Sequence, residues 1–222
     1  MESSEVRSAI RDIYDRFLIL PNLRLHMFRT AAVAEIMCDN WRGAAIDRNC
    51  IIAACLLHDI GNIVKFDLKK SDAPLLGNEV NRLGYWRKVK RDTIHRYGSN
   101  DHGATHNMMI EIGVNRRVLF LVDRIGDALR KKGSRDYAQM LCNYADNRVS
   151  PCGVLSISDR FSDFIDRYSR SSSEENRARC ALVRSLLGNA LKVEERLFVH
   201  ERIRPGQIND KSIRPYLDRY IE

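Results

Sequence analysis

Apolar residues recur at intervals of three and four along almost the whole chain, the spacing that places them on one face of an α-helix. One such stripe runs over residues 6–20 and is stopped by Pro21, and a second runs over about 23–41. Residues 51–57 are apolar without interruption, which predicts a central helix buried all round, with Asp47 as its N-cap. No segment alternates apolar and polar residues over the length of a strand. The pattern therefore predicts an all-α fold.

The remainder of the chain repeats the helical pattern in further pieces. These helices are expected over about 79–97, 101–112, 115–132, 134–147, 157–168 and 174–202. Capping residues mark three of their starts, namely Asn78, Asp101 and Ser156. We divide the chain into a helical core, residues 1–170, and a C-terminal helical extension, residues 171–222, that packs on the core.

Ionisable residues follow directly on the apolar run of the central helix. This helix ends in His58 and Asp59, and Gly61 is expected to supply a left-handed turn there. An unpaired ion next to a core costs several kcal/mol, so these side chains need a partner. His26 lies near the start of the preceding helix, and Asp146 lies at the C-terminal end of the helix over 134–147. Two imidazoles and two carboxylates suit a divalent metal that keeps positions open for water and substrate.

Three segments, in this order and in a helical chain, resemble the H…HD…D motif of the HD-domain superfamily of metal-dependent phosphohydrolases. They are Leu25-His26-Met27-Phe28-Arg29, Cys55-Leu56-Leu57-His58-Asp59-Ile60-Gly61-Asn62 and Ala145-Asp146-Asn147-Arg148-Val149-Ser150-Pro151. The resemblance covers roughly residues 10–165 and implies an HD-domain-like helical bundle. It also implies that His26, His58, Asp59 and Asp146 are the metal ligands. One divalent ion is expected, with Mn, Fe, Co, Ni, Zn and Mg as candidates and a second ion left open.

The resemblance further implies hydrolysis of a phosphate ester of a small substrate, with a nucleotide as the favoured class. Asp59, His102 and Arg148 are the candidate catalytic residues, and His102 could instead be a surface or capping residue. Arg29, Lys65 and Arg148 are the candidate phosphate-binding cations, although each could equally be a surface charge. These three cations lie close in sequence to the expected ligands.

Two other functions remain open at this stage. The same superfamily can build a di-iron oxygenase, for which additional ligands are needed; His95 and His106 have no assigned role. The segment 82–96 interleaves basic and aromatic residues, as nucleic-acid-binding segments do. Its apolar residues also fit a core stripe, which we favour. A nucleic-acid-binding or regulatory helical module with a structural metal is therefore the less favoured alternative.

Composition narrows the class of protein further. The 222 residues carry a net charge of +8 with a pI near 9.3, which favours anionic partners. No apolar stretch reaches the roughly 18 residues of a membrane span, and the N-terminus does not look like a secretory signal. The six cysteines show no CxxC pair or framework spacing. We therefore expect a cytoplasmic protein without a membrane partner, and leave a homodimer open.

Overall fold

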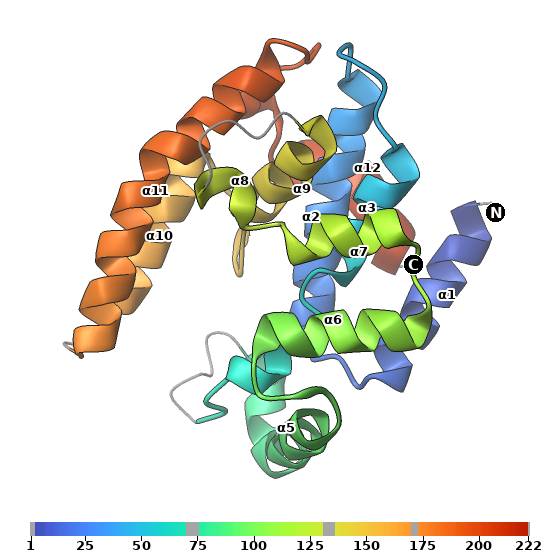
Figure 1. The fold of residues 1–222 in the computed structure, drawn as a ribbon, viewed down its shortest axis with the longest axis vertical. Coiled ribbons are helices and arrows are strands. Elements are labelled where there is room, and N and C mark those ends of the chain that lie inside the picture. Colours follow the sequence, from blue (N-terminus) through green and yellow to red (C-terminus); the bar gives the residue numbers. More distant parts are fainter. Residues whose placement is uncertain (1–2, 70–75, 131–135, 170–172, 222) are drawn as a thin grey trace.

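The computed structural model describes residues 3–69, 76–130, 136–169 and 173–221. These residues are helical almost throughout, so the all-α prediction is confirmed (Figure 1). The exception is a short antiparallel hairpin of β1 (Val149–Ser150) and β2 (Gly153–Val154). Strands of two residues leave no alternating pattern in a sequence, which is why the hairpin was not predicted. None of the described helices is both long and apolar enough to span a lipid bilayer.

The helices divide the described chain into short rods joined by tight connections. In chain order they are α1 (Ser3–Arg16), α2 (Pro21–Asn40), α3 (Arg48–Leu57), η1 (Asn62–Lys65), η3 (Gly77–Arg82), α5 (Leu83–Tyr97), α6 (Asp101–Ile112), α7 (Arg116–Asp123), α8 (Asp127–Arg130), α9 (Tyr137–Arg148), α10 (Ile157–Ser169), α11 (Glu174–Phe198), η4 (Pro205–Gln207) and α12 (Asp210–Ile221).

The core is built around α2, α3 and α9, which pack on one another. The predicted N-cap of α3 is confirmed, because the Asp47 side chain accepts a hydrogen bond from the Cys50 backbone N–H at 3.0 Å. Most residues of α2 after Met27 and seven of the ten residues of α3 are buried. These helices are therefore held rigidly by burial of apolar surface, and the side chains at their ends can be positioned precisely.

Several predicted boundaries were wrong for local reasons. Helix α1 ends at Arg16, before Pro21. Pro21 is the first residue of α2, where its missing N–H costs no hydrogen bond. The predicted helix over 115–132 is broken after Asp123 into α7 and α8, and the one over 79–97 begins as the 3-10 helix η3. Asn100, rather than Asp101, caps α6 by accepting from the Gly103 N–H at 2.9 Å.

Gly61 also differs from its prediction. Its φ is −88°, so it does not form a left-handed turn. A Cβ at this position would collide with the backbone nitrogen of Thr105 on α6. The Thr105 hydroxyl also accepts a hydrogen bond from the Gly61 N–H at 3.0 Å. Glycine is required here because α6 packs directly against the chain that follows α3.

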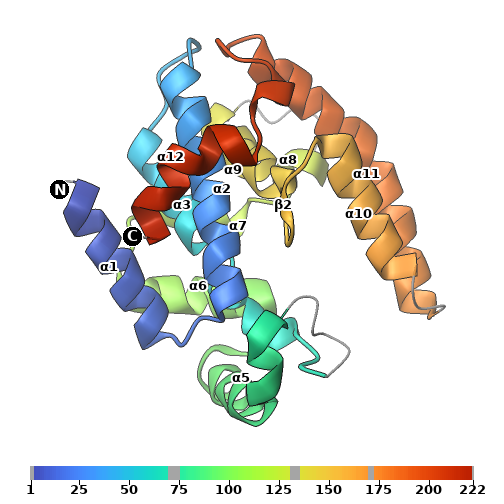
Figure 2. The same ribbon diagram turned by 180° about the vertical axis from the view of Figure 1, so that it is seen from behind.

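The C-terminal part contains a two-helix arm and a helix that returns to the core. Helix α10 begins with the predicted Ser156/Asp159 capping pair and packs mainly on α11, and the two form an arm along one side of the molecule (Figure 2). The segment after Pro205 is longer than expected, since it forms α12, which packs on α2. These contacts run across residue 170, and the division of the chain at that residue stays a prediction.

Candidate metal centre

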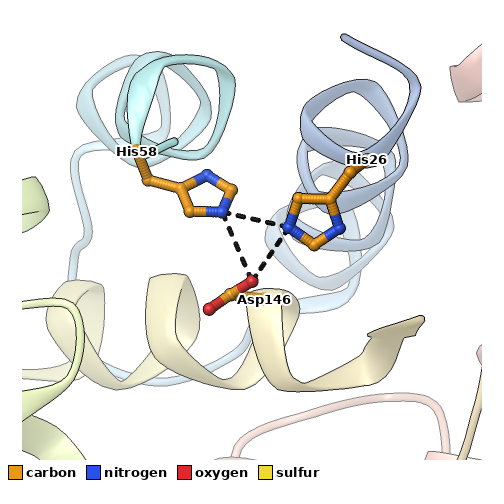
Figure 3. Close-up of side chains that lie close together, drawn as sticks. All are labelled: His26, His58 and Asp146. Carbon is orange, nitrogen blue, oxygen red and sulfur yellow. Dashed lines mark hydrogen bonds and ion pairs between the residues drawn. The ribbon is translucent and has the colours of Figure 1, made fainter. Parts of the chain in front are cut away.

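Three side chains far apart in the sequence converge where α2, α3 and α9 meet (Figure 3). The Nε2 atoms of His26 and His58 are 3.2 Å apart, and Asp146 Oδ1 lies 3.1 Å from the first and 3.3 Å from the second. One ligand atom from each residue lies within 4.8 Å of the others. This is the spacing at which a single cation could contact all three.

Asp59 stands at the edge of this cluster. Its Oδ2 lies 3.7 Å from the Nε2 atoms of both His26 and His58, which is beyond hydrogen-bonding distance of either imidazole. The residue follows the C-cap of α3, so the turn after that helix carries it to the side of His58. The structure therefore brings together all four residues that the sequence singled out, with Asp59 more loosely held than the other three.

The ring of His58 is oriented by a hydrogen bond of Nδ1, the nitrogen that points away from the cluster. Its side chain is 1% exposed, and its Nδ1 donates a hydrogen bond to the backbone carbonyl oxygen of Cys55 at 2.9 Å. In the neutral imidazole this bond places the proton on Nδ1, so Nε2 carries the lone pair that faces His26 and Asp146. A backbone carbonyl that holds the second nitrogen of an imidazole is the usual support of a metal-binding histidine.

The charges of the cluster favour an added cation. Burial alone would lower the pKa of His58, but the Asp59 and Asp146 carboxylates outweigh it and raise that pKa to about 9. Burial acts in the opposite direction on Asp146, yet the two imidazoles hold its pKa well below the usual value. The site thus attracts positive charge, and two imidazole nitrogens with carboxylate oxygens are the donors that divalent transition metals take.

Lys65 lies close to the acidic side of the cluster. Its Nζ is 3.0 Å from Asp101 Oδ2 at the start of α6. Partial burial would lower the pKa of Lys65, but attraction by Asp59 and Asp101, with a smaller part from Asp146, raises it. The predicted phosphate-binding cation therefore stands where the carboxylates of the cluster act on it.

Arg29 lies one helical turn after His26 on the same face of α2. One of its terminal nitrogens donates to the Pro151 carbonyl oxygen at 3.2 Å, next to the hairpin that follows α9. Its Nε is buried and has no hydrogen-bond partner among the described residues. Its place agrees with the prediction of a nearby cation, and its role stays a prediction.

Arg148 requires a correction, because it is not placed to contact substrate. The residue is 2% exposed, and its guanidinium donates to the carbonyl oxygens of Leu155, Pro205 and Ile208 and to the Tyr144 hydroxyl. Tyr144 lies on α9 itself, whereas Leu155 precedes α10 and Pro205 and Ile208 precede α12, so the guanidinium links α9 to later segments of the chain. The structure therefore gives no support to the catalytic and phosphate-binding roles predicted for Arg148, since its donors are used inside the protein.

His102 lies in the first turn of α6, and its side chain is exposed. Among the described residues, it does not join the group formed by His26, His58 and Asp146. It lines a separate cavity together with His106, and His95 is exposed near the end of α5. The structure therefore does not bring His102 into the cluster itself, and its catalytic role stays a prediction.

Arg160 was missed by the sequence reasoning. It is 6% exposed on α10, lies 3.7 Å over the ring of Phe164 and donates to Asp163 at 2.6 Å. Burial and then the charge of Arg167 lower the pKa of Arg160, while the Asp146 carboxylate opposes them. The charge of this buried cation on the arm is therefore felt by Asp146 of the cluster. The sequence signal would have been an arginine at an inward position of the apolar stripe of α10.

Comparison with known proteins gave one match, to a family model that covers part of the cluster. Residues 24–95 match the family model described as HD domain. This range contains His26, His58 and Asp59, three of the four clustered residues. No curated protein and no solved structure gave a match.

Proposed function

Residues 24–95 belong to the HD-domain superfamily, and from that premise we propose that the protein is a metal-dependent phosphohydrolase of a small phosphorylated molecule. The observation that carries the proposal is the convergence of His26, His58 and Asp146 within 4.8 Å, with Asp59 beside them. The net charge of +8 supports an anionic substrate, and a nucleotide is the class we favour.

The four clustered side chains would hold the metal. His26 and His58 would bind through Nε2, and Asp59 and Asp146 through carboxylate oxygens, so three helices contribute to one centre. A divalent ion bound there supplies positive charge to the transferring phosphoryl group and lowers the pKa of a coordinated water. The Cys55 carbonyl fixes the ring of His58, so this ligand is oriented before any ion arrives.

The chain itself would position the phosphate. Lys65 is anchored by Asp101 and stands near the cluster, which suits a cation that binds phosphate oxygens. Arg29 would supply a second donor group from the helix that carries His26. Because phosphoryl transfer depends on positioning and charge, such donors can carry much of the catalysis. We assign Asp59 a second role beside metal binding, to accept a proton from the attacking water, since its Oδ2 is not hydrogen-bonded to either imidazole.

The test uses the whole chain, freed of metal with a chelator and then supplied with single divalent metals. We expect phosphate release from at least one member of a panel of nucleotides and sugar phosphates, and loss of that release in Asp59→Ala. Asp92→Ala, which changes an exposed aspartate on α5, is the matched control and should leave turnover unchanged. Unchanged turnover in Asp59→Ala, with far-ultraviolet circular dichroism like that of wild type, would overturn the proposal.

The same preparation separates the two alternatives. A di-iron oxygenase would hold two irons per chain and consume O₂ with its substrate, without releasing phosphate. A nucleic-acid-binding module would bind generic RNA or DNA with an affinity that falls steeply as salt rises. Either result, together with no phosphate release from any substrate on the panel, would replace the phosphohydrolase proposal.

A further inference from the structure

A second group of imidazoles and carboxylates lies on α6 and α7. His102 and His106 are four residues apart on α6, which puts them on the same face of the helix. Asp123, the last residue of α7, faces them, and both of its carboxylate oxygens lie 3.0 Å from His106 Nδ1. A cavity of about 250 Å³ adjoins these side chains. It is lined by His102, Gly103, Thr105, His106, Val122 and Asp123.

The contact with Asp123 determines which nitrogen His106 can offer. When Nδ1 carries the proton and donates it to the carboxylate, Nε2 is left with its lone pair. A carboxylate on the far nitrogen is the common support of a metal-binding imidazole, and it makes that imidazole a stronger base. The Asp123–His106 pair thus has the arrangement that precedes metal binding.

His102 supplies a second imidazole one helical turn away. Two histidines at this spacing on one helix can bind the same cation, because their side chains extend from adjacent positions of one face. Both histidines and Asp123 are accessible, with the His106 side chain 42% exposed and that of Asp123 36% exposed. An ion could therefore reach them from solvent without any opening of the core.

The electrostatic balance at this place is mixed, and it decides how tightly a cation could bind. The N-terminus of α6 disfavours positive charge, and Lys65 is paired with Asp101 at 3.0 Å, which offsets the charge of that carboxylate. Two carboxylates oppose these effects, Asp101 next to His102 and Asp123 against His106. The Gly103 N–H donates to Asn100 Oδ1, which reduces the positive partial charge at the N-terminus of the helix. The Asp123 carboxylate beside His106 therefore places negative charge at the cavity, which favours a bound cation.

We propose that His102 and His106 bind a divalent transition-metal ion of the zinc class in this cavity, with Asp123 orienting His106. This site shares no ligand with the cluster of His26, His58, Asp59 and Asp146. Two imidazoles leave most coordination positions to water or to an anionic group. The cavity adjoins the turn between α3 and η1 through Thr105, which lines the cavity and accepts the hydrogen bond of the Gly61 N–H.

The experiment is a titration of the whole chelator-treated chain with Zn²⁺ alone, in competition with a chromophoric chelator. We expect His102→Ala and His106→Ala each to remove one class of zinc site from wild type and to leave the other class unchanged. Asp123→Asn should weaken the same class by about 10- to 100-fold. His95→Ala, an exposed histidine outside the cavity, is the matched control and should bind like wild type.

The outcome can be read independently of the clustered residues at the ends of α2, α3 and α9. The titration is repeated in an Asp146→Asn chain, in which the class of site that remains should be the one that His106→Ala abolishes. If that remaining class does not respond to His106→Ala and His102→Ala, the proposal is wrong. It is also wrong if wild type and the two histidine variants bind the same number of ions with the same affinity. Thermal unfolding of each variant shows that a lost site is not a lost fold.

Discussion

Arg148 offers a sharp test of the structure, because the sequence and the structure assign it different roles. Its guanidinium donates to three backbone carbonyl oxygens and one hydroxyl, and the residue is 2% exposed. We predict that Arg148→Met destabilises the fold without a specific effect on catalysis. Methionine has a similar length and fills part of the space, so the main change is the loss of the donors.

The magnitude follows from the acceptors that would be left behind. A buried polar group without its partner costs about 1–3 kcal/mol, and removal of one side of a buried charged network costs about 3–5 kcal/mol. The Pro205 carbonyl is only partly buried and can turn to water, which limits the sum. We therefore expect the free energy of unfolding to fall by about 4 kcal/mol. With a urea m-value of about 2 kcal/mol/M, the midpoint should fall by about 2 M.

Urea unfolding followed by circular dichroism measures this shift, and phosphate release in the absence of urea measures activity. Arg91→Met, at an exposed position of α5, is the control and should move the midpoint by less than about 0.5 M. The reasoning would be refuted by an Arg148→Met chain with the midpoint of wild type and a large loss of turnover. That result would indicate that the Arg148 guanidinium acts on the substrate and does not stabilise the fold.

Two further predictions concern Glu201 and Lys65. Burial raises the pKa of Glu201 to about 8 from an ordinary value of 4.5, and neither of its oxygens has a hydrogen-bond partner among the described residues. The folded state therefore loses stability as pH rises from about 4.5 to 8. From urea midpoints, Glu201→Gln should be more stable than wild type by on the order of 1–2 kcal/mol at pH 8.5 and equal to it near pH 4.5. A difference in stability that does not change with pH would contradict this prediction. Lys65→Met should lower kcat/KM for phosphate release by about 10²-fold, because a donor near the cluster is lost. Lys88→Met, on the exposed side of α5, should leave kcat/KM unchanged. Equal kcat/KM values for the two variants would count against phosphate binding by Lys65.

The convergence of the cluster could be predicted because each member sits at a point that the helical pattern fixes. The apolar run over 51–57 must be buried, and the helical pattern on both sides of it favours a helix. The polar residues after it therefore need partners in the interior. His26 and Asp146 lie near helix ends that the sequence also marked. The resemblance to the H…HD…D motif then supplied the order in which these ends meet.

Arg148 shows where such reasoning stops. Three of its acceptors are backbone carbonyls up to 60 residues away, and no local pattern announces a backbone carbonyl as a partner. Its proximity to Asp146 in sequence suggested that Arg148 belongs to the metal site. In the structure its side chain instead contacts the carbonyl oxygens of Leu155, Pro205 and Ile208. The hairpin after α9 was missed because strands of two residues leave no pattern. Helix α12 does have a helical stripe, at Ile213, Leu217 and Tyr220, and the sequence reasoning did not use it.

The most direct test of the central claim counts metal ions held by the cluster. Chelator-treated protein is dialysed against Mn²⁺, Co²⁺ or Zn²⁺ in turn, and bound metal is measured per chain in His106→Ala and in His106→Ala with Asp146→Asn. The account predicts one bound ion per chain in the first protein and none in the second, for at least one of these metals and with both chains folded. Equal metal contents in the two proteins, for every metal, would contradict it.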